Sequence, residues 1–454
     1  MKICAYVQSQ YNKRNYKNDC MEIRQFCGLR VIIDTLERAG YSVEWAGLAT
    51  VHEYDIVLVS LTSDSDWWEF VKERIQWRQG NYKVIIGGAG CLHITPFLPH
   101  GDYFSLGRGE ESVVNLVKKL DGKDGFEDDS IIEAKTFSPD KIYQIRQTDK
   151  VYPHKLPLIQ NKFFEENAIG CNHKCLFCGY SWQHKFVSNN DFYKIGYGLF
   201  DTGDAERAIL DIMKDPDSVD FGRLRSTALD GLSERLRYMV NKRISKECLE
   251  MFLRCMRDNT AKPHRVKFFN IVGYPTETEE DAFEFYETLK KIDLEPGKEL
   301  YYTKWGIVLS CMHFTPTPAT PMATAPVSKK NYRSYLHNLL SPSLKGIRIY
   351  DGLNFWCVDG IGTEHLATVM RRIVAMRGGE NDIENVIKIC RSKKFWSAPA
   401  GVQQATLEKY FDMDYLFGEF TAETLPSRYL RTYCKVEETW KRPAWHEEFM
   451  IRKK

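Results

Sequence analysis

Short apolar runs alternate with helical patterns over residues 1 to about 120. The apolar runs are Ile3–Val7, Ser42–Trp45, Asp55–Leu61, Lys83–Ile86 and Tyr103–Leu106, and the helical patterns are Arg24–Ala39, Trp67–Arg78 and Glu111–Leu120. Strands that alternate with helices are typical of a parallel sheet with helices packed on its faces. The pattern therefore predicts an α/β unit over residues 1–122.

The rest of the chain divides into three further parts. Periodicity weakens after Leu120, and the polar, glycine-bearing stretch at 121–129 predicts a linker over residues 123–150. A second α/β unit is expected over residues 151–326, with strands near 163–169 and 266–272. Helical patterns at 364–377 and 382–391 then predict a mainly helical C-terminal domain over residues 327–454.

Composition and charge narrow the protein class. The chain has 454 residues, enough for two or three domains, and 63 Lys and Arg against 61 Asp and Glu give a formal charge of +2. No overall field therefore points to nucleic acid or membrane. The N-terminus lacks the layout of a signal peptide and no apolar stretch is long enough to span a bilayer, so we expect a cytoplasmic protein.

Three cysteines, Cys171, Cys175 and Cys178, lie within eight residues of one another. An odd number of thiols in an intracellular chain favours one soft metal centre over disulfides. Zinc commonly takes two Cys-x-x-Cys pairs, and the sequence has no second pair. An iron-sulfur cluster usually takes four cysteines, so three leave one iron open to another ligand. A zinc knuckle or a redox-inert cluster remains the alternative.

Neighbouring residues place this loop in the expected fold. A strand at 163–169 would deliver the cysteines at its carboxyl end, where α/β barrels carry their active sites. Four polar or aromatic residues follow the third cysteine: Tyr180, Trp182, His184 and Lys185. They could line a cofactor pocket, but ordinary packing accounts for such a set more often.

The Cys-x-x-x-Cys-x-x-Cys spacing, with Gly170 before the first cysteine and Phe177 before the last, resembles the cluster motif of the radical S-adenosylmethionine (SAM) superfamily. The resemblance implies a 4Fe-4S cluster on the three cysteines, with Phe177 beside it. It also implies that SAM chelates the fourth iron through its amino and carboxylate groups. Reductive cleavage would then give a 5'-deoxyadenosyl radical, with an electron donor such as flavodoxin or ferredoxin as a partner.

The block at 219–236 reads as a strand, a turn at Asp230-Gly231 and a helix that starts near Leu232. It is similar to a strand-to-helix passage of the superfamily whose polar residues contact the SAM ribose or carboxylate. That resemblance makes four residues cofactor candidates: Arg225, Ser226, Asp230 and Ser233. The local alternative is helix capping by Asp230 and surface pairing of Glu234 with Arg235.

A second motif follows the strand at 266–272. Gly273-Tyr274-Pro275-Thr276-Glu277-Thr278 resembles the Gly-x-Pro-Gly-Glu-Thr segment of radical SAM proteins with cobalamin-binding domains, with threonine for the second glycine. The resemblance implies that Asn270, Ile271 and Gly273 contact the adenine. Capping of the next helix by Thr276 with Glu279 is a local role compatible with it. The proline-rich stretch at 312–321 is similar to a segment that closes many such cores.

The N-terminal unit is similar to the cobalamin-binding domain that precedes many radical SAM cores. The resemblance implies that Gly87, Gly88 and Gly109 flank the corrin or its nucleotide tail. The Asp-x-His-x-x-Gly signature of that family is missing, and no histidine precedes His52. Either cobalamin binds without that histidine, or the domain has kept its fold and lost the cofactor.

The sequence thus predicts a radical SAM enzyme that abstracts hydrogen from an unidentified substrate, with cobalamin-dependent methylation, rearrangement or cyclisation as sequels. One alternative is a methylthiotransferase-like modifier of RNA or protein, with a second cluster on Cys4, Cys20 or Cys27, and Cys91. Another is a non-catalytic cobalamin or iron-sulfur sensor. Basic and aromatic residues after Leu430 leave a nucleic-acid substrate open, although a solvated helical face explains them more simply.

Overall fold

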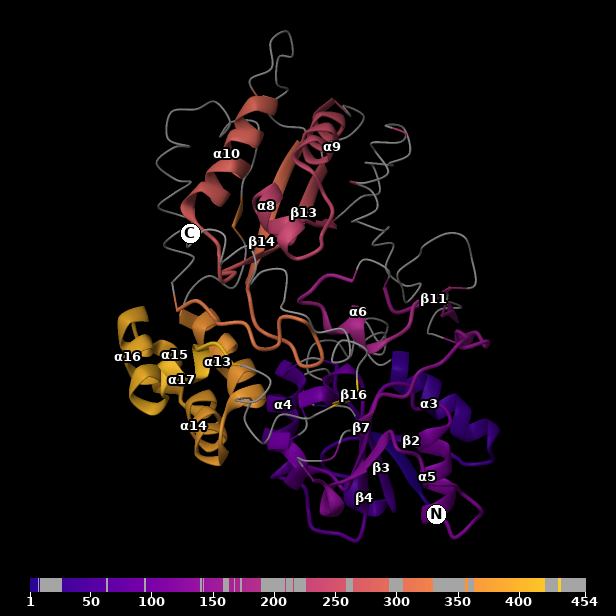
Figure 1. Cartoon of the computed structure of the whole chain (residues 1–454). Coiled ribbons are helices and arrows are strands. Elements are labelled where there is room, and N and C mark those ends of the chain that lie inside the picture. Colours follow the sequence, from indigo (N-terminus) through magenta and orange to yellow (C-terminus); the bar gives the residue numbers. More distant parts are fainter. Residues whose placement is uncertain are drawn as a thin grey trace.

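The structure is a computed structural model of the chain, drawn in Figure 1. It describes residues 1–6, 8, 27–62, 64–93, 95–138, 141, 143–157, 163–166, 168–171, 174–188, 209, 215, 226–258, 264–293, 305–329, 356–357, 363–420 and 432–433. Within these ranges the protein is a mixed α/β structure with parallel sheets and many helices.

The N-terminal part is built around a six-stranded sheet of order β2-β1-β3-β4-β5-β6. Its strands are β1 (Ile3–Tyr6), β2 (Val43–Ala46), β3 (Ile56–Ser60), β4 (Lys83–Gly87), β5 (Tyr103–Ser105) and β6 (Ile131–Glu133). The first five run parallel, and β6 pairs antiparallel with β5. An order of 2-1-3-4-5 belongs to doubly wound sheets, which bind ligands beyond the carboxyl ends of their strands.

Helices cover both faces of this sheet because its strand residues alternate between two cores. On one face Ile3, Ile56 and Ile85 pack against α3 (Cys27–Arg38) and α5 (Ser112–Leu120). On the other face Tyr6, Val57 and Val84 share a core with the aromatic side chains of α4 (Asp64–Arg74). Four 3₁₀ helices complete this part: η2 (Val51–Glu53), η3 (Ala89–His93), η4 (Thr95–His100) and η5 (Ala134–Thr136).

The expected N-terminal strands and helices are present, with ends that shift by a few residues. The range 123–150, expected to be a linker, contains two strands. Strand β6 completes the edge of the first sheet, and β7 (Tyr143–Gln144) pairs with β16 (Thr432–Tyr433) near the other end of the chain. The range expected as a linker therefore includes short paired strands, since a polar composition does not prevent a short strand from pairing at a sheet edge.

A second sheet of four parallel strands follows, in the order β12-β13-β14-β15. Its elements are β12 (Ser226–Ala228), α8 (Glu234–Met239), α9 (Lys246–Asp258), β13 (His264–Val272), α10 (Glu279–Asp293), β14 (Trp305–His313) and β15 (Trp356–Cys357). Apolar residues of α9 and α10 form a core with Val266 and Phe268 of β13 and Leu309 of β14. The alternation of strand and helix is what the sequence predicted for this region.

The strand expected at 163–169 is two short strands instead. β9 (Phe163–Phe164) pairs antiparallel with β8 (Leu156–Pro157), and β10 (Ala168–Ile169) pairs antiparallel with β11 (Val187–Ser188). The cysteine segment is therefore carried by a two-stranded antiparallel ribbon, within the described residues, and not by a strand of the parallel sheet. Strand pairing is decided by distant residues, which a local apolar pattern does not reveal.

The described residues 363–420 are mainly helical, and the helical C-terminal domain over 327–454 stays a prediction. Their helices are α13 (Thr363–Arg377), α14 (Glu380–Arg391), α15 (Lys393–Ser397), α16 (Ala400–Tyr410) and α17 (Met413–Phe417). In Figure 1 these helices lie beside α4 of the N-terminal part, and α13 packs against α4 and η4. Trp67, Trp68 and Phe97 accordingly share one apolar core with Met370 and Ile373. In the described part of the chain, no helix combines the length and the apolar character needed to cross a bilayer.

Candidate metal and cofactor site

The three cysteines lie on one loop between β10 and α6 (Gly179–Gln183). Cys171 and Cys175 are buried, and Cys178 is half-buried. The loop is tied to two other loops through Leu176: its N–H donates to the carbonyl of Val240, and its carbonyl accepts from the N–H of Met322. Residues from two distant segments therefore hold the loop in place.

The loop has a tight backbone. Gly170 has a φ of 73°, and a Cβ placed on it would lie 2.8 Å from the carbonyl oxygen of Lys185. Lys174 also has a positive φ, of 51°, which is uncommon for a residue with a side chain. Its carbonyl accepts from Asn241 Nδ2 at 3.0 Å, and the indole N–H of Trp182 donates to the carbonyl of Cys175 at 2.9 Å.

The donor set of this loop suits a soft metal centre. Burial raises the pKa of the Cys178 thiol, and a smaller part of the rise comes from the charge of Cys171. Among the described residues, no three Cys, His, Asp or Glu side chains converge as a metal-binding group. The fit of the loop to a cluster therefore rests on the number, type and spacing of its thiols.

Aromatic packing places the loop at the carboxyl ends of the second sheet. The Phe177 ring lies 6.4 Å from that of Tyr274, which follows β13, and Tyr274 lies 5.3 Å from Phe314, which follows β14. Ile271 and Phe177 are partly buried against the same apolar cluster. The structure thus brings two of the predicted cofactor residues, Phe177 and Ile271, to one place.

Gly273 follows β13 at the same edge, with a φ of 87°. The Glu277 carboxylate accepts from the N–H groups of Gly273 and Tyr274, and so fixes this turn. Its Oε1 atom is buried without a hydrogen-bond partner, and burial raises the pKa of Glu277 to about 8. Glu277 was not among the predicted cofactor residues, although it lies within the motif.

Asn270 was expected to contact the adenine, and its side chain lies elsewhere. It is 1% exposed, and its Nδ2 lies 4.0 Å from the sulfur of Cys311, which belongs to the core beneath α9 and α10. Ile271 points to the opposite face because side chains alternate along a strand. Phe269 lies on the same face of β13 as Ile271 and is 41% exposed, so this face of the strand is the more open one.

Asp230 and Ser233 have structural partners. The Asp230 carboxylate pairs with Lys242 Nζ at 2.7 Å, and Asp230 has a positive φ of 53°. Ser233 is the N-cap of α8, since its Oγ accepts from the N–H of Leu236, and it donates to Asp281 at 2.6 Å. Arg225 lies outside the described residues, and Ser226 opens β12.

Three local predictions in this region need correction. The cap of α8 is Ser233 and not Asp230, because Asp230 lies four residues before the helix. Arg235 pairs with Asp281 and not with Glu234. The cap of α10 is formed by Thr278 with Asp281 and not by Thr276 with Glu279, since the N–H of Thr278 donates to the Asp281 carboxylate at 2.8 Å.

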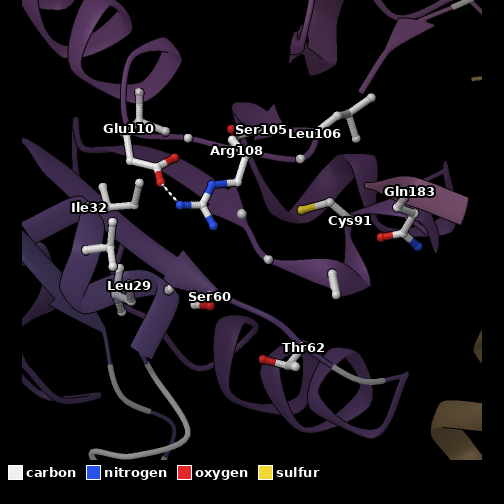
Figure 2. A pocket seen from close by; sticks show the side chains of 18 of the residues that line it. Leu29, Ile32, Ser60, Thr62, Cys91, Ser105, Leu106, Arg108, Glu110 and Gln183 are labelled. Carbon is white, nitrogen blue, oxygen red and sulfur yellow. Dashed lines mark hydrogen bonds and ion pairs between the residues drawn. The ribbon is translucent and has the colours of Figure 1, made fainter. Parts of the chain in front are cut away.

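A cavity of about 250 Å³ lies at the carboxyl edge of the first sheet. Figure 2 shows Arg108, Cys91 and Gln183 around this hollow. Its wall includes all three glycines predicted to flank a cofactor: Gly87, Gly88 and Gly109. Tyr180, Gln183 and His184, which follow the cysteine loop in the chain, also line the cavity. The cavity therefore lies between the first sheet and the cysteine loop.

Two glycines of this wall cannot be replaced without moving the backbone. Gly88 has a φ of 101°, and a Cβ on it would lie 2.4 Å from the carbonyl oxygen of Leu61. Gly107 has a φ of 81°, and its Cβ would lie 2.4 Å from the carbonyl oxygen of Arg146. These glycines let loops cross closely at the edge of the sheet, which leaves room for a ligand above the strand ends.

Arg108 links the cavity to the segment before the cysteine loop. Its guanidinium forms hydrogen bonds of 2.7 and 2.9 Å with Glu166 and a further ion pair with Glu110. Its Nε is buried without a partner. On the far side of the loop, Gln147 bonds the carbonyl of Gln183 at 2.6 Å and the N–H of Lys185 at 2.9 Å. Arg108 and Gln147 thus hold the two arms of the loop from segments that precede it in the chain.

His184 is the histidine of the cavity wall. Its Nδ1 is buried and has no hydrogen-bond partner, and its ring packs edge-on against Tyr180 at 5.8 Å. Burial, together with the positive charges of Arg108 and Lys174, lowers the pKa of His184 to about 4. The imidazole is therefore neutral near pH 7.

The cysteines considered for a second cluster do not form a group of metal ligands among the described residues. Cys4 and Cys91 are buried in the core beneath α4, and Cys27 packs in a separate cluster with Tyr152 and Leu156. Burial raises the pKa of the Cys27 thiol to about 11. Cys20 lies outside the described residues.

Comparison with solved structures gives two structures of one protein, the cobalamin-dependent S-adenosylmethionine radical enzyme OxsB. The form with aqua-cobalamin bound is 10% identical, with 91% of this chain and 57% of that chain covered and a TM-score of 0.25. The apo, selenomethionine-labelled form is 10% identical, with 90% and 56% covered and the same TM-score of 0.25. The chain thus spans just over half the length of these solved chains.

No protein-family model matches the sequence, and no curated protein matches it. The sequence motifs had predicted a radical SAM enzyme with a cobalamin-binding-type domain, which is the class of enzyme to which OxsB belongs.

Proposed function

We propose that this protein is a radical SAM enzyme with an N-terminal domain of the cobalamin-binding type. The observation that carries the proposal is the three-cysteine loop, held against Tyr274 and Phe314 at the carboxyl ends of parallel strands. That edge of an α/β sheet is where ligands bind. In this proposal the cobalamin-binding-type domain spans residues 1–122 and the radical SAM core, a partial (β/α) barrel, spans residues 151–326. Residues 123–150 link these two domains, and a helical C-terminal domain spans residues 327–454.

Cys171, Cys175 and Cys178 would hold a 4Fe-4S cluster, which when bound with SAM supplies one-electron reductive chemistry. The chain's own residues position and shield that chemistry. Phe177 and Ile271 form an apolar wall beside the loop, and Glu277 fixes the turn at Gly273 through two backbone N–H groups. The apolar wall would exclude water from a reactive intermediate.

The cavity between the first sheet and the cysteine loop is the proposed cobalamin site. At Gly88 and Gly107 two backbone segments cross closely, which leaves the space beyond the strand ends free for a ligand. Apolar residues such as Leu29 and Ile85 line this space. Its volume of about 250 Å³ is below the usual 300–1,000 Å³ of sites for drug-sized ligands, so it would enclose only part of a corrin. A low-potential donor such as flavodoxin or ferredoxin would be the redox partner.

The test is anaerobic cluster reconstitution of the full chain, with iron and cobalt counts and an assay for 5'-deoxyadenosine under strong reduction. About four irons per chain, stoichiometric cobalt after incubation with cobalamin, and SAM cleavage are expected. Cys178→Ala should lose the iron and the cleavage, whereas Cys248→Ala, a half-buried thiol on α9, should keep both.

Other results would point to other functions. Full iron and cleavage in Cys178→Ala would overturn the proposal. Iron without SAM cleavage would favour a sensor, and about eight irons would favour the two-cluster, methylthiotransferase-like alternative. Retention on RNA that weakens steeply with salt would favour a nucleic-acid substrate.

A further inference from the structure

The turn that follows α8, residues 238–243, lies against the cysteine loop. The carbonyl of Val240 accepts from the N–H of Leu176, and the Asn241 side-chain amide donates to the carbonyl of Lys174 at 3.0 Å. Asn241 has a positive φ of 62°, and its own N–H donates to the carbonyl of Tyr238 at 3.0 Å. These bonds close the turn and hold it in a fixed place beside the loop.

The turn carries an exposed cation, Arg243, which has no carboxylate partner among the described residues. The Nε of Arg243 donates to the Oδ1 of Asn241 at 3.4 Å. One amide side chain therefore joins Arg243 to the Lys174 carbonyl of the cysteine loop. The neighbouring Lys242 is paired with Asp230 at 2.7 Å, so Arg243 is the charge that the turn presents to solvent.

Tyr238 adds an exposed aromatic side chain to the same turn. It is 52% exposed and lies in the last turn of α8. Two acids of this region, Glu234 and Glu284, belong to the other end of α8, where they accept from the N–H groups of Lys246 and Glu234. Tyrosine and arginine are enriched at protein–protein interfaces. An exposed ring beside a positive charge therefore suits a protein partner with an acidic surface.

We propose that this turn, with Tyr238 and Arg243, is the docking surface for an acidic one-electron carrier protein that reduces the metal centre of the cysteine loop. The inference rests on the proposed function, which requires a low-potential donor. A docked carrier gives up one electron and the centre takes it up, so the step needs no further oxidant or reductant. Interfaces between electron-transfer proteins are small and weak, so a single turn can provide much of the contact. Its charge would act mainly on the rate of encounter.

The test measures binding and not catalysis. A dye-labelled flavodoxin, which is an acidic carrier, is titrated with the full chain after cluster reconstitution, at low salt and without SAM or reductant. Fluorescence anisotropy gives the Kd, which should rise with salt because the attraction is screened. Arg243→Glu should weaken binding about tenfold, whereas Arg243→Lys keeps the charge and should retain most of the affinity. Lys409→Glu makes the same change of net charge on α16, which lies apart from α8 in Figure 1, and should bind like the unmutated protein.

The outcomes separate this surface from the proposed function. Equal effects of Arg243→Glu and Lys409→Glu would overturn the surface, and so would a lack of flavodoxin binding by a chain that holds iron and cleaves SAM. Binding that depends on Arg243 in a chain that takes up no iron would overturn the proposed function and leave the docking surface standing. If Arg243→Glu lowered retention on RNA and left flavodoxin binding unchanged, the surface would belong to a nucleic acid instead.

Discussion

The guanidinium of Arg108 forms two hydrogen bonds, of 2.7 and 2.9 Å, to the carboxylate of Glu166. The two side chains are 16% and 5% exposed, so the pair is largely removed from water. Arg108 follows β5 of the first sheet, and Glu166 lies in the ribbon that leads to Cys171. This ion pair is therefore a joint between the two halves of the proposed active site.

Replacing Glu166 tests that joint. Glu166→Gln places an amide against the guanidinium and should lower the free energy of unfolding by about 3 kcal/mol, as expected when one partner of a buried pair is removed. Urea unfolding of the full chain measures the change. Glu127→Gln is the matched control, because its pair with Lys119 is on the surface, with side chains 89% and 52% exposed, and no measurable change is expected. Equal effects of the two substitutions would contradict the assignment.

Gly88→Ala should destabilise the protein by about 2 kcal/mol or more, because its φ of 101° and the Leu61 carbonyl both oppose a Cβ. Gly401→Ala is the control, since Gly401 lies in α16 and a Cβ there meets nothing within 4 Å. Alanine favours helices over glycine by about 1 kcal/mol, so the control should be neutral or stabilising. Thermal unfolding monitored by circular dichroism compares the stability of the two variants with that of the unmutated protein. A Gly88→Ala variant as stable as the parent would show that the crossing at Leu61 can open.

Arg377 is a buried cation of α13 that binds backbone carbonyls. It donates to the carbonyls of Leu416, Gly418, Ala323 and Ala325, and it is 1% exposed. Arg377→Met leaves these acceptors without their donor and should cost about 3 kcal/mol or more of unfolding free energy. Urea unfolding tests this, with the exposed Lys409→Met as a control that should change little. A small effect of Arg377→Met would mean that water replaces the guanidinium.

Glu277 predicts a specific pH dependence. Its pKa is raised from 4.5 to about 8 in the folded protein, so between these pH values the folded state holds a proton that the unfolded state has lost. Stability contributed by this group therefore falls as pH rises over that range. His184 and His313, whose pKa values are lowered from 6.5 to about 4, act in the opposite sense and only below pH 6.5 or so.

Between pH 6.5 and 8 these two histidines do not contribute, so the effect of Glu277 on the free energy of unfolding can be measured by itself. Over this range, Glu277→Gln should gain stability relative to the unmutated protein, by up to about 1 kcal/mol per pH unit. Urea midpoints measured at several pH values give the difference. Parallel curves for the two proteins would show that Glu277 is ionised in the folded state at neutral pH.

The shared core of α4 and α13 predicts that the N-terminal and C-terminal parts unfold together. Ile373 is fully buried in that core, and Ile373→Ala should cost about 2–5 kcal/mol. Tryptophan fluorescence, which reports on Trp67 and Trp68 of α4 among others, and far-ultraviolet circular dichroism should shift by the same amount. A shift in circular dichroism alone would show that the helices unfold separately.

Local sequence patterns predicted the local features of this protein. The strands and helices of the first sheet, the cysteine loop and the glycines of the cavity wall all follow from short runs of residues. The pairing of β10 with β11 was not predictable, because it depends on residues about twenty positions apart. The caps at Ser233 and Thr278 differ from prediction by two or three residues, which is the usual uncertainty of a helix start.

For the site residues too, local motifs point to some features, whereas others depend on residues that are distant in the sequence. Phe177 and Ile271 pack against one apolar cluster whereas Asn270 faces the core, because the register of β13 decides which side chains reach the loop. Arg108 and His184 become prominent only when the first sheet and α6 are brought face to face. A buried partner or an unpartnered nitrogen is a property of the folded chain, and no local pattern encodes it.

The contact between α4 and α13 also has a consequence for synthesis on the ribosome. The apolar face of α4, with Trp67 and Trp68, is complete early in translation, whereas the helix that covers it begins at Thr363. At about 5–20 residues per second, some 300 further residues require roughly 15–60 s. For that time Trp67 and Trp68 have their partners in the N-terminal part, such as Phe97, but not the cover that α13 provides, so we expect this face to be exposed on the nascent chain while the cysteine loop emerges.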